Sequence, residues 1–125
     1  MKKYRAKLKF IFLFIIILSF NFLCFSQSPI GAWERYYEDE SGTKIKSVVI
    51  FSEKFQAIAM FNSESGEFIY SNGGTWKLNG DMMTEKVEFD TKNSERVGDE
   101  VTFRVDISKN TLSIPESNWI FKRID

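Results

Sequence analysis

Glu85 and Glu88 are the acidic residues whose close spacing most invites a catalytic interpretation. Glycosidases place two carboxyl groups on either side of the bond that they cleave. Here both glutamates lie in a run in which Met83, Val87 and Phe89 alternate with polar residues, and this alternation predicts a strand. Residues three apart on a strand point to opposite faces. The two carboxylates therefore cannot flank one bond, and we discount this chemistry.

The rest of the side-chain inventory excludes several classes of enzyme. The 125 residues contain no histidine and one cysteine, so Ser-His-Asp and Cys-His nucleophiles and the common zinc and haem ligand sets are missing. The acidic run Glu38-Asp39-Glu40-Ser41-Gly42 lacks the alternate acids and distal glutamate of a calcium loop and predicts a solvated turn. We expect no catalysis, no metal and no cofactor; an enzyme would need carboxylate or tyrosine chemistry.

The first 26 residues have the charged, apolar, small-residue order of a secretory signal peptide. Residues 10–25 are almost wholly apolar but shorter than the roughly 20 residues of a spanning helix. We expect cleavage after Ser26 and a secreted or periplasmic protein. The alternative is a lipoprotein attached through Cys24, which Phe22 and Leu23 disfavour because small residues are needed there. Attachment to a membrane is expected only through an uncleaved leader or through this lipid.

Removal of the leader would change the charge of the protein. The whole chain balances 17 basic and 17 acidic residues, and five bases but no acid precede residue 10. Residues 27–125 therefore carry 17 − 5 = 12 bases against 17 acids, a net charge of −5. An acidic surface repels phosphate backbones, so we expect no nucleic-acid partner. We expect residues 27–125 to form one monomeric domain without a disulfide.

A period of two dominates residues 27–125. Val101, Phe103, Val105 and Ile107 alternate with polar residues, as in a half-buried strand. Turn signals separate such runs at short intervals. The pattern predicts an all-β, antiparallel up-and-down barrel of about eight strands. The expected strands are about 31–38, 43–52, 54–62, 67–71, 74–79, 82–91, 99–108 and 111–114, with a closing strand near 118–124; residues 43–62 could be one hairpin turning at Glu53-Lys54.

Turn sequences also predict strand registers. Asn79-Gly80 is a strong two-residue hairpin signal, and as the loop it would place Trp76 opposite Met83 and Gly74 opposite Glu85. In the long hairpin around residues 94–98, opposed charges favour Glu88 facing Arg104 and Lys86 facing Asp106. A loop at Lys109-Asn110 would pair Ile107 with Leu112 and Val105 with Ile114.

These residues resemble a known family. Gly31-Ala32-Trp33 at the start of the first strand, together with residues 73–80, 84–89, 97–103 and 119–123, resembles small secreted bacterial members of the lipocalin superfamily. The resemblance implies a barrel floor in which Trp33 points inward beside Gly31, and Arg123 or Lys122 packs across the indole. The chain lacks the cysteines and the long helix of larger lipocalins, so their ligands do not carry over.

The interior of such a barrel is either filled by side chains or holds one small ligand. The ligand hypothesis places Tyr70, Trp76, Phe89 and Phe103 on the wall, with Arg35 and Glu85 as polar anchors. Glu85 is expected inside, either as a polar group at the base of a pocket or in a structural ion pair with Arg35. The expected function is binding of a small apolar or amphipathic molecule.

The alternative function is that of a filled barrel acting through its surface, as an envelope-associated protein-interaction module. A contiguous patch of exposed apolar residues would support it. The residues expected on outer faces are Tyr36, Ile58, Met60 and Ile69.

Overall fold

The computed structural model of this protein describes residues 27–125. The expected signal peptide, its cleavage after Ser26 and the lipid attachment at Cys24 lie outside the described residues. None of the helices within residues 27–125 is long and apolar enough to cross a membrane.

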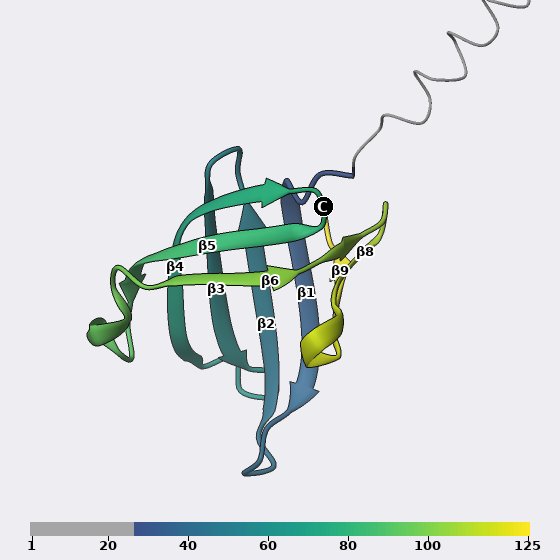
Figure 1. The fold of residues 1–125 in the computed structure, drawn as a ribbon. Coiled ribbons are helices and arrows are strands. Elements are labelled where there is room, and N and C mark those ends of the chain that lie inside the picture. Colours follow the sequence, from purple (N-terminus) through teal and green to yellow (C-terminus); the bar gives the residue numbers. More distant parts are fainter. Residues whose placement is uncertain (1–26) are drawn as a thin grey trace, which may run out of the picture.

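The described chain consists of short antiparallel strands joined by tight turns, with two 3₁₀ helices. In Figure 1, β5 and β6 cross in front of the more upright β1, β2 and β3. The elements are β1 Gly31–Glu38, β2 Lys44–Phe51, β3 Phe55–Asn62, β4 Phe68–Asn79, β5 Met82–Asp90, η1 Ser94–Arg96, β6 Glu100–Arg104, β7 Asp106–Ile107, β8 Thr111–Ile114, η2 Pro115–Ser117 and β9 Trp119–Arg123.

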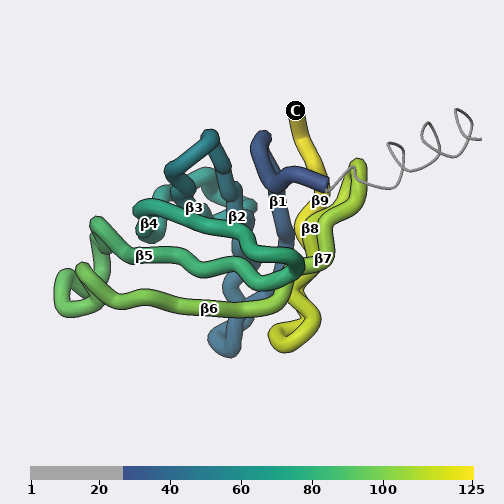
Figure 2. Tube along the Cα trace, turned by 45° about the horizontal axis from the view of Figure 1, so that its top comes forward, coloured from purple at the N-terminus to yellow at the C-terminus, as the bar shows by residue number. Residues whose placement is uncertain are grey.

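All nine strands belong to one sheet in the order β6-β5-β4-β3-β2-β1-β9-β8-β7. Its two edge strands are consecutive in the chain and are separated only by Val105, so the chain itself joins one edge to the other (Figure 2). The predicted all-β, antiparallel, up-and-down barrel is confirmed. One expected strand, 99–108, is divided at Val105, whose N–H donates to the Asp81 carbonyl at 2.8 Å. Two others, 67–71 and 74–79, are the single strand β4 because Asn72-Gly73-Gly74 is extended.

The first two hairpins define the inner face. Ile45, Ser47, Val49 and Phe51 are buried in β2, whereas the residues between them are more exposed. The turn at Glu53-Lys54 is confirmed: the Ser52 N–H donates to the Phe55 carbonyl at 2.9 Å. Residues 43–62 are thus one hairpin.

The expected outward placement of Ile58 and Met60 in β3 is wrong. Ile58 pairs with Val49 and Met60 with Ser47, which are both buried, so all four lie on the inner face. Phe55 is 55% exposed on the outer face. Because both faces of β3 are apolar, the alternation could not identify the inner one, and the pairing with β2 decides it.

The expected register between β4 and β5 is also wrong. The loop is Gly80-Asp81, with Gly80 at φ +63°, and glycine at the first loop position is the requirement of a type II′ turn. Trp76 consequently faces Glu85. A bulge between Gly73 and Gly74 then places Gly74 opposite Val87. A side chain at Gly74 would collide with the Lys86 carbonyl, so glycine permits the close approach of the two strands there.

The registers of the later strands agree with expectation in one hairpin and differ in the other. The pairing of Ile107 with Leu112 is confirmed, but Ser113 pairs with Asp106, and Val105 lies outside the ladder. The charge-based register is wrong: Lys86 pairs with Glu100, the first residue of β6, and Arg104 pairs with Met82 and not with Glu88. Opposed charges on a sheet contribute only about 0.2–1 kcal/mol. The observed register pairs Met83 with Phe103, and the burial of these apolar side chains stabilises the fold by more than such a charge pair.

The densest packing surrounds Trp33 and Met83, whose side chains are fully buried. Around them lie Val49 and Phe51 of β2, Val105 between β6 and β7, Leu112 of β8 and Phe121 of β9. This cluster occupies only part of the interior, and a cavity takes up the remainder.

Candidate functional site

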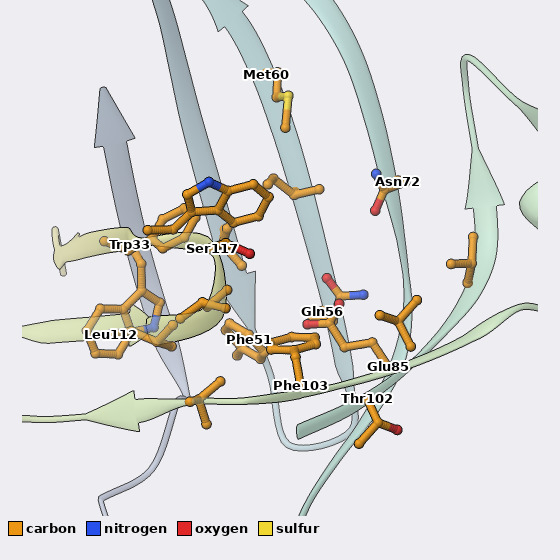
Figure 3. A pocket seen from close by; sticks show the side chains of 18 of the residues that line it. Trp33, Phe51, Gln56, Met60, Asn72, Glu85, Thr102, Phe103, Leu112 and Ser117 are labelled. Carbon is orange, nitrogen blue, oxygen red and sulfur yellow. The ribbon is translucent and has the colours of Figure 1, made fainter. Parts of the chain in front are cut away.

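A cavity of about 440 Å³ occupies the barrel interior beside the core cluster. This volume lies within the roughly 300–1,000 Å³ usual for small-molecule sites. Its walls are mainly apolar, and Figure 3 shows side chains from several strands converging on it. The lining residues are Trp33, Val49, Phe51, Gln56, Ile58, Met60, Tyr70, Asn72, Glu85, Val87, Arg96, Val101, Thr102, Phe103, Val105, Leu112, Ile114, Glu116, Ser117, Trp119 and Phe121.

Trp33 and Arg123 make the contact that the resemblance implied. The Arg123 guanidinium lies over the Trp33 ring at 4.2 Å, and the indole Nε1 donates to the Pro29 carbonyl at 2.8 Å. Arg123 also donates from Nε to the Lys109 carbonyl at 2.8 Å. A side chain at Gly31 would collide with the guanidinium. Lys122, the other candidate, is exposed and takes no part in this contact. Arg123 Nη1 donates to the Ile30 carbonyl at 3.2 Å, and this bond and the contact with the Trp33 ring tie the start of β1 to the end of β9.

Glu85 and Gln56 are two of the polar residues that line the cavity. Gln56 is only 5% exposed, and it pairs with Gly74 of β4, which has no side chain to fill the space beside it. Figure 3 shows both side chains pointing into the same part of the cavity. Burial raises the pKa of the Glu85 carboxyl to about 7. Glu85 is thus inside the barrel as expected, but opposite Trp76 and not opposite Gly74.

Tyr70 and Phe103 also line the cavity, in agreement with the sequence prediction. Phe103 comes from β6 and packs against the core cluster. Tyr70 comes from β4, and burial raises the pKa of its hydroxyl, with the charges of Tyr37 and Asp90 adding to the effect.

Trp76 points inward but supports the cavity instead of lining it. Its ring meets Phe51 edge-on, with centroids 5.6 Å apart and an interplanar angle of 86°. Its Nε1 donates to the Ser52 carbonyl at 2.9 Å. Trp76 therefore holds Phe51, which does line the cavity, against the turn between β2 and β3.

The expected place of Phe89 on the inner wall is wrong. Phe89 is 42% exposed and pairs with Gly73, where a side chain would collide with its ring. The bulge beside Glu88 reverses the alternation of β5, so Val87 points inward while Phe89 points outward. Phe89 borders a second, shallow pocket on the outer surface together with Ile50 and Phe55.

Arg35 does not form the expected ion pair with Glu85. Its guanidinium lies 4.2 Å from the Tyr37 ring and 5.0 Å from the Trp119 ring. Burial lowers its pKa. The ion pairs within residues 27–125 include neither Arg35 nor Glu85. Arg35 thus packs against Trp119, which lines the cavity, but does not itself line the cavity.

The cavity rim contains residues that the sequence reasoning missed. Arg96 of η1 lines the cavity, and its Nη1 lies 3.4 Å from Asp90 Oδ2. Asp90 Oδ1 accepts the N–H groups of Lys92 and Asn93 at 2.9 and 2.8 Å, and these bonds lower the pKa of Asp90. An aspartate that bonds the backbone two residues on is a recognised turn signal, so Asp90-Thr91-Lys92 could have indicated this loop.

Glu116 and Trp119 complete the rim from η2 and β9. Trp119 is 39% exposed, so this side of the cavity meets solvent. Glu116 is a second carboxylate that lines the cavity, in addition to Glu85. The acidic turn at residues 38–42 is closed by its own hydrogen bonds, because Asp39 Oδ1 accepts bonds from the N–H groups of Ser41 and Thr43. Within residues 27–125, no group of three or more potential ligand side chains could hold a metal ion.

Comparison with known proteins does not assign a function to this cavity. No family model, no curated protein and no solved structure matches the chain. The functional conclusion therefore depends on the cavity and on the residues that surround it.

Proposed function

We propose that this protein is an exported, non-catalytic carrier that binds one small apolar or amphipathic molecule inside its barrel. The observation that carries the proposal is the cavity of about 440 Å³, whose mainly apolar wall is interrupted by the polar side chains of Gln56 and Glu85. Ligand sites typically combine apolar walls with a few fixed polar groups. Export rests on the signal-like residues 1–26, and the resemblance to small lipocalin-like proteins points to the same function.

A fluorescent apolar dye, N-phenyl-1-naphthylamine, tests the proposal directly. We expect saturable binding of one dye per chain, with increased fluorescence. Ile58→Trp would fill part of the cavity, and we expect at least about tenfold weaker dye binding, equivalent to about 1.4 kcal/mol. The matched control is Ile69→Trp, at a 41% exposed position of β4, which should bind the dye like the unmodified protein. Equal binding by both variants would contradict a site inside the barrel.

The surface-interaction alternative has one observation in its favour. Ile50, Phe55 and Phe89 are 55%, 55% and 42% exposed and border the shallow outer pocket. Tyr36 and Ile69 are exposed as expected, but Ile58 and Met60 line the cavity, so the patch first predicted is broken. Native mass spectrometry of the purified protein distinguishes the two functions: a retained small molecule supports the carrier, whereas a stable protein complex without one supports the interaction module.

A further inference from the structure

The interior of the cavity holds a carboxylate for which the described chain provides no counter-charge. Glu85 takes part in no ion pair of residues 27–125. Its pKa is raised by burial alone, with no charge or hydrogen bond offsetting that effect. An ionised carboxylate in such surroundings is unfavourable unless a cation or several donors meet it. A cation or hydrogen-bond donor for the Glu85 carboxylate must therefore come from a molecule in the cavity.

Gln56 provides an acceptor in the same part of the cavity. Its side chain is buried and forms no hydrogen bond with other groups of residues 27–125. Every side-chain nitrogen or oxygen atom of these residues that is sealed from solvent has a hydrogen-bond partner. The Gln56 amide must therefore reach the open space of the cavity. A carboxylate and an amide oxygen together can accept two of the three N–H bonds of an ammonium group.

The nearby cations are already engaged. Arg96 is bonded to Asp90 at the rim, and the Arg35 guanidinium lies against Tyr37 and Trp119. The other titratable groups that line the cavity are Tyr70 from β4, Arg96 from η1 and Glu116 from η2. The lining residues from β3 and β6 are all uncharged.

We infer that the cavity selects a small organic amine, whose ammonium group lies between Glu85 and Gln56 and whose apolar body packs against Phe51 and Phe103. This inference rests on the proposed ligand-binding function and specifies its ligand class. Aromatic rings attract cations through their faces, and Phe51 and Phe103 line the same cavity as Glu85. A ligand carboxylate of the same length would instead place two like charges together.

Calorimetry with octylamine, 1-octanol and octanoate tests the inference, because the three have the same number of carbons and differ in the head group. At pH 8 we expect octylamine to bind at least about tenfold more tightly than either of the others. Between pH 8 and pH 6 its affinity should fall about tenfold, because Glu85 takes up a proton that the ammonium must displace. Octanol or octanoate binding as tightly as octylamine would overturn the inference.

Two variants identify the responsible carboxylate. Glu85→Gln should weaken octylamine binding at least about tenfold at pH 8, remove its pH dependence and leave octanol affinity within about twofold. Glu116→Gln, which removes the other carboxylate of the cavity, should retain the amine preference and its pH dependence. The opposite result would assign the preference to Glu116 and overturn the inference. The comparison of head groups on the unmodified protein remains decisive if Glu85→Gln does not fold.

The outcomes separate this inference from the proposed function. If the apolar dye and octanol bind but octylamine has no advantage, only the amine preference is wrong. If neither the dye nor any of the three octyl compounds binds, the proposed carrier function itself is wrong.

Discussion

Replacing Glu85 by glutamine should stabilise the fold at alkaline pH but not at acid pH. Burial raises the pKa of Glu85 from an ordinary 4.5 to about 7. Below pH 4.5 the group is protonated in both the folded and the unfolded chain, so it makes little difference to stability. Between pH 4.5 and about 7 the unfolded chain loses its proton while the folded chain keeps it. The folded state therefore loses stability as the pH rises through this window.

The magnitude follows from the difference between the two pKa values. From 4.5 to about 7, at 1.36 kcal/mol per unit, ionised Glu85 costs the fold at most about 3 kcal/mol above pH 7. Glutamine has nearly the same shape and carries no charge. Glu85→Gln should therefore match the unmodified protein at pH 4 and exceed its free energy of unfolding by up to about 3 kcal/mol at pH 8.

Urea unfolding at pH 4 and pH 8, followed by tryptophan fluorescence, measures this difference. Other titrating groups are common to both proteins, so their contributions cancel in the comparison. The matched control is Glu88→Gln, the same change at an exposed position three residues along β5, and Glu85→Gln should gain more stability than this control between pH 4 and pH 8. A Glu85→Gln variant that is less stable than the unmodified protein at pH 8, or whose stability is changed by the same amount at pH 4 and pH 8, would refute an unpaired, half-buried carboxylate and favour a structural ion pair.

Three other predictions follow from the structure. Arg123→Met should lower the free energy of unfolding by about 1–2 kcal/mol in urea titrations, because it removes the cation over Trp33 and a hydrogen bond; an unchanged stability would contradict the role of this contact. Asp90→Asn should be less stable than the unmodified protein at neutral pH, and the deficit should vanish as the pH falls through the lowered pKa of Asp90, since the carboxylate contributes only when ionised; a deficit that persists in acid would point to another cause. Phe103→Ala should cost about 3 kcal/mol and weaken dye binding, whereas Phe89→Ala should cost less than about 1 kcal/mol and leave dye binding unchanged; the reverse order would restore Phe89 to the inner wall.

The strands of the barrel could largely be predicted from the sequence because alternation and turn residues are local signals. The Glu53-Lys54 turn and the pairing of Ile107 with Leu112 needed only neighbouring residues. The inward position of Glu85 followed from the same alternation. The contact between Trp33 and Arg123, by contrast, joins residues 90 apart and was expected only through a family resemblance.

The errors have physical causes that no local pattern contains. The bulge at Gly73 and Gly74 inserts one residue into β5 and turns Phe89 outward. In β3 both faces are apolar, and only pairing with Val49 turns Ile58 inward. The register between β5 and β6 was assigned from surface charges, whose contribution is small beside the burial of Met83 against Phe103.

The sequence alone predicted an all-β barrel, because its apolar residues recur with a period of two. Its composition, without histidine and with one cysteine, excluded several classes of enzyme. Whether that barrel is filled or hollow was decided by the tertiary structure. The cavity exists because Arg35 is held against Tyr37 and Trp119, Phe89 is turned outward, and Gly74 contributes no side chain to the interior. A cavity is the space that side chains from distant parts of the sequence leave unfilled. Only the arrangement of these side chains in the folded protein therefore decides that Glu85 faces an open cavity without a partner.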